Sequence, residues 1–228
     1  MLDEYLKYAN GMGARDEVIA WINLVVPAYF RKHDGVARYN FEHIIDYLVS
    51  SSAPKRLLKM SIEQANVAAD KWSKANQKKG RGLVDESSDI NVVHSYADGS
   101  AIVKLLTEKA YKREGFLMSH CLGSYSPKAD IEIYSYRDNK NNPHATFEVR
   151  KSGGEITQIK GKGNGEIHPK YILPILDFMT SIGQKPRPSE MKNLGYHHID
   201  KAHHEFVRSI VGSDKFLIMI HGDMYAHP

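Results

Sequence analysis

The sequence predicts an α+β protein: an N-terminal helical segment, followed by a β-hairpin–helix–antiparallel β-meander–helix core. Apolar residues recur at helical spacing as far as Trp72, whereas short alternating runs bounded by turn residues begin at Ile90. We therefore divide the chain into a helical region at 1–79, an α+β core at 80–183 and a histidine-rich extension at 184–228, which we expect to pack on the core.

The composition is typical of a globular chain, with 42% hydrophobic and 25% charged residues among 228. A single cysteine excludes an intramolecular disulfide framework and favours a reducing, cytoplasmic environment. We expect neither a secretory signal nor a membrane partner, because the N-terminus lacks the signal pattern and the apolar runs are short. The net charge of +4 permits contact with polyanions without requiring it.

Three helices are expected in the N-terminal region. Asp16 can cap the first, and Pro27 is expected to bend or end it. The second follows Asn40, a favourable cap residue. The third is placed from Pro54 onward, and its apolar seam extends to Trp72 with the regular spacing of packed helices.

The segment from Ser73 to Asp89 changes in composition and predicts a linker or an exposed loop. It is polar and contains Gly80 and Gly82. Its basic cluster could contact phosphates, or it could be the solvated end of a helix; the cluster comprises Lys74, Lys78, Lys79 and Arg81.

The core begins with a hairpin signal. The Asp98-Gly99 pair lies between two apolar runs, a pattern that favours a β-hairpin. Thr107 can cap the next helix, and Gly123 is expected to end it. His120 and Cys121 would then lie in the last helical turn.

Three short strands are expected between Ile131 and Lys160, separated by turn residues and therefore antiparallel. In the first strand, Ile133, Ser135 and Arg137 share one face. A final helix then carries Pro174 near its first turns.

Four motifs occur in order through this core. They are Met118-x-His120-Cys121-Leu122-Gly123-x-Tyr125, Ser135-x-Arg137-Asp138, Pro143-x-Ala145-Thr146-Phe147-Glu148-Val149 and Gln158-x-x-Gly161-x-x-Asn164. The ordered series, between Val92 and Ile182, resembles PcfJ-like domains of conjugative plasmids, other mobile elements and phages. The resemblance implies a phage or mobile-element context in the cytoplasm of a bacterial host. It implies no catalytic mechanism, and we expect no cofactor.

Candidate catalytic residues are Cys121 with His120 or another histidine, and Glu148 with Arg137. A nucleophilic cysteine needs a lowered pKa, which the negative end of a helix opposes. Adjacent helix side chains also diverge by about 100°, so His120 is a poor automatic partner for Cys121. The alternatives are a buried structural thiol, a metal ligand or a redox group.

Candidate nucleic-acid or anion-binding residues are Arg137, Gln158, Lys160, Lys162 and Asn164. Arginine can bind phosphate with two hydrogen bonds, and amides can read bases. The glycine-lysine stretch around Lys162 can hold an anion on its backbone amides, or it can be a plain turn. The polar strand residues can equally support the fold through ion pairs.

The extension holds His197, His198, His203 and His204, with His221 and His227 beyond them. No zinc-binding pattern is present, so we expect no metal site and interpret them as surface or hydrogen-bonded histidines. An apolar run around Leu217 indicates a late strand.

The leading hypothesis is an accessory protein that binds nucleic acid or a host nucleic-acid-processing protein. One alternative is a small enzyme acting on a nucleotide-like substrate. A second alternative is a non-catalytic module that binds a protein partner.

Overall fold

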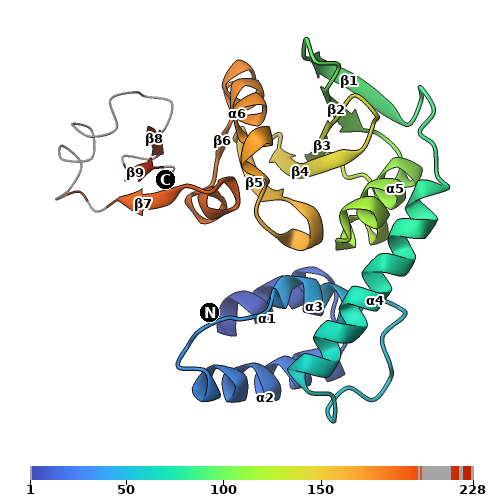
Figure 1. Ribbon diagram of the computed structural model, residues 1–228, viewed down its shortest axis with the longest axis vertical. Coiled ribbons are helices and arrows are strands. Elements are labelled where there is room, and N and C mark those ends of the chain that lie inside the picture. The colour runs from blue at the N-terminus through green and yellow to red at the C-terminus, as the bar shows by residue number, and fades with distance from the viewer. Residues whose placement is uncertain (1, 200, 202–216, 221–222, 227–228) are drawn as a thin grey trace.

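The computed structural model describes residues 2–199, 201, 217–220 and 223–226, and it has the predicted α+β class (Figure 1). The helical region contains α1 (Leu2–Gly11), α2 (Asp16–Lys32), α3 (Phe41–Val49) and α4 (Ile62–Arg81). Helix α4 extends from this region to the α+β core (Figure 1).

The core is a six-stranded sheet whose strands follow one another in chain order. The strands are β1 (Ile90–Ser95), β2 (Ala101–Leu105), β3 (Ile131–Arg137), β4 (Pro143–Arg150), β5 (Glu155–Lys160) and β6 (Lys185–Pro186). All neighbours are antiparallel except β5 and β6, which are parallel. The hairpin and the meander are therefore confirmed.

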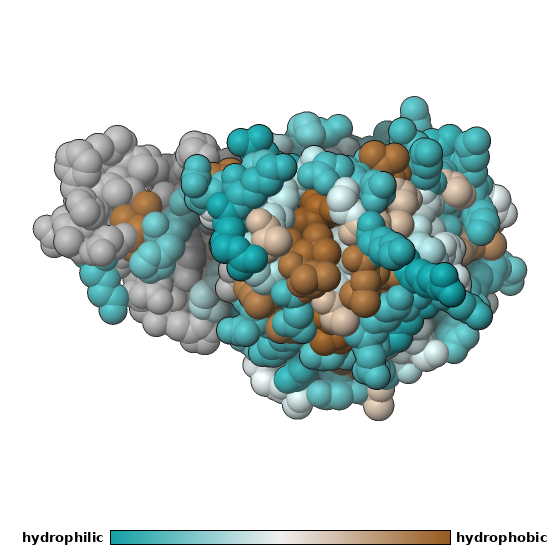
Figure 2. Space-filling model, turned by 90° about the horizontal axis from the view of Figure 1, so that it is seen from below, coloured by the Kyte–Doolittle hydropathy of each residue, from teal (hydrophilic) through white to brown (hydrophobic). Residues whose placement is uncertain are grey.

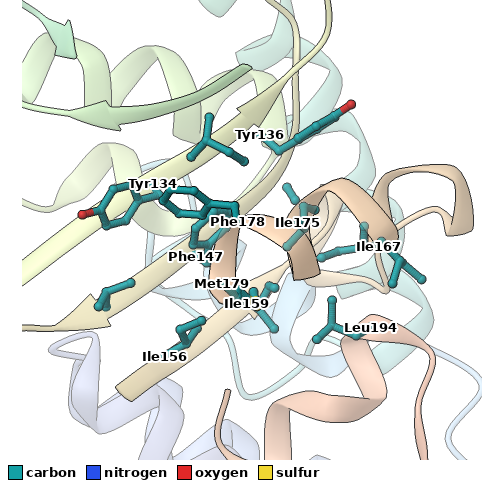
Figure 3. Close-up of a cluster of buried hydrophobic side chains, with 14 of the residues drawn as sticks. Tyr134, Tyr136, Phe147, Ile156, Ile159, Ile167, Ile175, Phe178, Met179 and Leu194 are labelled. Carbon is teal, nitrogen blue, oxygen red and sulfur yellow. The ribbon is translucent and has the colours of Figure 1, made fainter. Parts of the chain in front are cut away.

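Helices cover both faces of this sheet: α5 (Glu108–Met118) and α6 (Ile172–Ser181). Tyr134 and Phe147 pack against Phe178 of α6 (Figure 3), whereas Ile133 packs on the other face in a cluster with Tyr111 of α5. The side chains of β3 alternate between the faces as predicted, and from Ile133 onward both sets are buried.

Short 3₁₀ turns connect the main elements. They are η1 (Cys121–Ser124), η2 (Lys162–Asn164), η3 (Pro169–Tyr171) and η4 (Pro188–Leu194). The predicted site residues Cys121, Lys162 and Asn164 lie on η1 and η2, whereas four others lie on strands: Arg137, Glu148, Gln158 and Lys160.

The helical region has its own apolar core, in which Trp21 and Ile44 are fully buried. Asn40 caps α3 as predicted, accepting a hydrogen bond from the backbone of His43. The face turned away from the sheet shows strips of apolar surface among hydrophilic residues (Figure 2), and the exposed apolar side chains of the region include Leu24 and Leu58.

Pro27 lies inside α2, which ends at Lys32, five residues after the proline. Another helix starts later than expected. The third predicted helix does not start at Pro54; α4 begins at Ile62, after a capping box formed by Ser61 and Gln64. Two reciprocal hydrogen bonds to the free backbone amides make this the favourable start.

The predicted linker from Ser73 to Asp89 is wrong in its first half, because α4 continues to Arg81, whereas residues 82–89 connect α4 to β1 without helix or strand. Ser73, Asn76 and Gly80 are its buried positions in this stretch, and a Cβ at Gly80 would lie 2.8 Å from Phe116 of α5. The polar sequence is the solvated face of a packed helix, which was the alternative interpretation. The predicted boundary after residue 79 thus falls within α4.

Helix α5 ends earlier than predicted. Thr107 caps it as expected, but Met118 is its last residue and Ser119 is left-handed, with φ of 61°. His120 and Cys121 therefore lie beyond the helix. Gly123 does not cap the helix. Its backbone packs closely against Gly115 of α5, and its nitrogen lies 2.4 Å from the position that a Cβ on Gly115 would take.

The C-terminal extension contributes in part to the core. Met191, Leu194 and Tyr196 are buried in the cluster beneath α6. Strands β7 (His197–Ile199), β8 (Leu217–Ile220) and β9 (Asp223–Ala226) form a second sheet, which confirms the late strand. His203, His204, His221 and His227 lie outside the described residues. No helix among the described residues is long and apolar enough to cross a bilayer.

The close approach of Gly115 to Gly123 can be tested by substitution. Gly115→Ala should destabilise the protein by about 2 kcal/mol, because the new methyl group meets immobile backbone. Urea denaturation followed by circular dichroism measures the change. Gly11→Ala is the control, since nothing lies within 4 Å of its Cβ position. Equal stability of Gly115→Ala and wild type would contradict this packing.

Candidate functional site

Arg137 lies in a buried ion-pair network between α5 and the sheet. Its side chain is 1% exposed, and its guanidinium donates to Asp85 at 2.5 Å and to Glu114 at 3.1 Å. Arg113 also pairs with Asp85, at 3.2 Å. Buried charges need such partners. Arg137 therefore supports the fold, and the prediction that it binds phosphate is not supported by these contacts.

His120 belongs to the same network. Its Nε2 lies 3.1 Å from the hydroxyl of Thr146, which donates to Glu114 at 2.7 Å. Because that hydroxyl has only one proton to donate, Nε2 must carry the hydrogen toward Thr146. Burial lowers the pKa of His120 to about 4, so the imidazole is neutral at pH 7.

Cys121 points into a different cluster and is not paired with His120. Its thiol donates to the Tyr125 hydroxyl at 3.4 Å and lies 4.0 Å from the hydroxyl of Tyr8. Burial and the nearby Asp46 carboxylate raise the pKa of the thiol far above its ordinary value. These surroundings favour the thiol over the thiolate that a nucleophile requires.

Asp46 is the centre of that cluster and joins the helical region to the core. It is 2% exposed and accepts hydrogen bonds from Tyr8 and Asn164, both at 2.7 Å. Burial raises its pKa to about 7, against the opposing effect of these two bonds. Asn164 is thus a structural residue that connects η2 to α3.

Glu148 and Gln158 lie opposite each other on β4 and β5. Glu148 accepts a hydrogen bond from the Thr157 hydroxyl, and Gln158 is exposed. Arg137, the predicted partner of Glu148, is bound elsewhere. The described contacts therefore do not bring Glu148 and Arg137 together.

Lys160 forms an ion pair across the two regions. It is 8% exposed, and its Nζ donates to Glu42 of α3 at 2.8 Å, with Glu190 at 3.9 Å. The side chain is therefore not free for a phosphate, as the sequence had suggested.

Lys162 lines a pocket, which has a volume of about 430 Å³. Its walls include Gln77 and Arg81 from α4, His144 from β4 and Tyr171 from η3. Pockets of this size hold small ligands or a single residue of a polymer.

Two of the residues that line the pocket are cations, and no acidic side chain forms an ion pair with either of them among the described residues. Lys162 donates to Gln77 at 3.1 Å, and burial and then the charge of Arg81 lower its pKa. Across the described part of the chain, neither Lys162 nor Arg81 forms an ion pair, although Glu166 lines the same pocket. The pocket is therefore suited to an anion.

Metal binding has no comparable support. No group of three or more histidine, cysteine or acidic side chains is placed to hold an ion within the described ranges. The tail histidines beyond Lys201 are not among them.

Several partners of the site residues were not predicted from the sequence. Asp46, Asp85 and Glu114 each hold a predicted site residue, and Asp85 is 52 positions from Arg137. Tyr171 was missed as well. No local spacing relates these residues, because folding alone brings them together.

Arg137 should be needed for stability. Arg137→Ala leaves Asp85 and Glu114 as buried charges without their main partner, and we expect a loss of about 3–5 kcal/mol in the free energy of unfolding. Lys140→Ala, at an exposed position nearby, should change it by less than about 0.5 kcal/mol. Chemical denaturation of both variants distinguishes a structural arginine from a free phosphate ligand.

Asp46 and His120 should give opposite pH dependences. The pKa of Asp46 is about 7 in the folded protein and 3.8 in the unfolded chain. Between these values the folded state binds more protons, so the contribution of Asp46 to stability falls from pH 4 to 7. With a folded pKa of about 4 against 6.5, His120 makes stability rise from pH 4 to 6.5. Asp46→Asn should therefore steepen the rise of stability with pH in that window.

Thermal unfolding at pH 4.5, 5.5 and 6.5 measures this slope. His120→Gln serves as the opposite control, since its stability should fall with pH more steeply than that of wild type. Parallel profiles for Asp46→Asn and wild type would contradict the raised pKa of Asp46.

Comparisons with known proteins assign no role to these residues. No family model, curated protein or solved structure matches the chain. The resemblance to PcfJ-like domains stays a prediction from the motifs.

Proposed function

We propose that the protein binds nucleic acid through a basic surface that follows α4 and ends in the pocket, as an accessory protein of a phage or mobile element. The context rests on the resemblance to PcfJ-like domains. The binding rests on Arg81 and Lys162, which line one pocket without an ion-pair partner among the described residues. An anion between them would convert repulsion into attraction.

The basic surface extends beyond the pocket along α4. Lys71, Lys74, Lys78 and Arg81 are all exposed. At about 100° per residue they fall within an arc of about 80°, opposite the buried face of the helix. At about 1.5 Å per residue the stripe is about 15 Å long, which allows it to follow several phosphates of one strand.

The chemistry of the two pocket cations suits phosphate. An arginine can donate two hydrogen bonds to one phosphate, and a lysine adds a mobile point charge. Asn40 donates to the Gly163 carbonyl at 2.8 Å, and the Gly161 amide donates to Gly165 at 2.8 Å. The loop that carries Lys162 is thus ordered before a ligand arrives, which lowers the entropy cost of binding.

Two observations weigh against the enzyme alternative. The Cys121 thiol has a raised pKa and no hydrogen-bonded histidine among its described contacts. Arg137, the proposed partner of Glu148, is bound by Asp85 and Glu114. A host nucleic-acid-processing protein, or another protein partner, stays a prediction from the sequence.

Fluorescence anisotropy of labelled oligonucleotides across a salt series tests the proposal. Binding should weaken linearly in log salt, and Lys162→Ala and Arg81→Ala should each weaken binding and reduce the slope by about one. Arg150→Ala is the matched control, because it removes an exposed cation from the opposite end of β4 to the pocket.

Absence of binding at low salt would refute nucleic-acid binding. Binding with an equal loss in Arg150→Ala and Lys162→Ala would indicate attraction to overall charge and remove the pocket from the proposal.

A further inference from the structure

The pocket combines cations with an ordered pair of rings. The imidazole of His144 stacks on Tyr171, with the ring centres 4.3 Å apart and the planes 21° from parallel. Both residues line the pocket with Arg81 and Lys162. Aromatic rings beside cations are the combination that proteins use for unpaired bases.

His144 is held in place before any ligand binds. Its Nε2 lies 3.0 Å from the carboxylate of Asp138, and Tyr171 covers one ring face. Asp138 is itself fixed by the backbone amides of Lys140 and Asn142, each at 2.9 Å. A ring fixed in this way offers stacking area at little entropy cost.

The exposure of the ring is compatible with stacking. The side chain of His144 keeps 27% of its surface exposed although it lines a pocket. Tyr171 in turn rests against Tyr136 of the sheet, with ring centres 5.2 Å apart. The stacked pair is thus supported from the core side, and a base placed on His144 would extend an existing stack.

We infer that the pocket receives one unpaired nucleotide of a single strand, its base stacked on His144 and its phosphate between Arg81 and Lys162. This inference rests on the proposed function and specifies the class of nucleic acid. A base inside a duplex is stacked on both faces and paired at its edge, so it cannot enter the pocket. The pocket volume of about 430 Å³ is sufficient for one nucleotide.

The test uses single-stranded oligonucleotides containing 2-aminopurine and the corresponding duplexes, with the full chain at low salt. Stacking on His144 should quench 2-aminopurine in the single strand. His144→Ala should weaken single-strand binding by about 5- to 100-fold and abolish the quenching, because stacking contributes that much per base. Duplex binding through the α4 stripe should change by less than twofold.

His144→Phe is the matched variant. It keeps a stacking face but, like His144→Ala, loses the contact with Asp138, so recovered binding and quenching would assign the effect to the ring. Circular dichroism establishes that both variants are folded. Equal affinity of single strand and duplex, with unchanged binding by His144→Ala, would overturn the single-strand inference and leave the phosphate-binding proposal standing. No binding of either nucleic acid would overturn both.

Discussion

The pocket depends on the way the loop from Gly161 to Gly165 is fastened to α3. Asn40 binds the carbonyl of Gly163, and Asp46 binds the amide of Asn164. Lys160, immediately before the loop, pairs with Glu42. These contacts fix the backbone on either side of Lys162, and α4 brings Arg81 to the same place. The pocket with its two cations is formed only because both regions of the chain contribute residues to it.

This fastening also explains why the helical region and the core should not be regarded as independent units. Asp46 and Asn164 are both buried where the two regions meet, and their polar groups satisfy each other. Separating the regions would expose or orphan these groups, at a cost comparable to a lost hydrogen bond for each. Helix α4 strengthens the connection, because its C-terminal half packs on α5.

Two residues that the sequence offered as site candidates, Arg137 and His120, stabilise the fold. Arg137 neutralises Asp85 and Glu114, and Glu114 in turn accepts from Thr146, which binds His120. A low dielectric makes such a network strong when complete and costly when broken. Most of the residues that carry the resemblance to PcfJ-like domains are therefore part of a buried framework, whereas Gln158 is exposed. The proposed function instead uses residues around it that solvent reaches, among them exposed Arg81 and partly buried His144.

The sequence by itself determined the class of the fold and the order of most elements. Periods of 3.6 and 2 residues, the Asp98-Gly99 turn and the caps at Asn40 and Thr107 act over a few positions, so they can be read locally. The tertiary structure decided where helices stop under packing, as at Ser119, and how far α4 continues. It also decided which cations are neutralised. Lys160 and Lys162 are two positions apart, yet only Lys160 has a carboxylate partner among the described residues, because Glu42 comes from 118 positions away. Charge pairing depends on distance in space, and no sequence pattern encodes that distance.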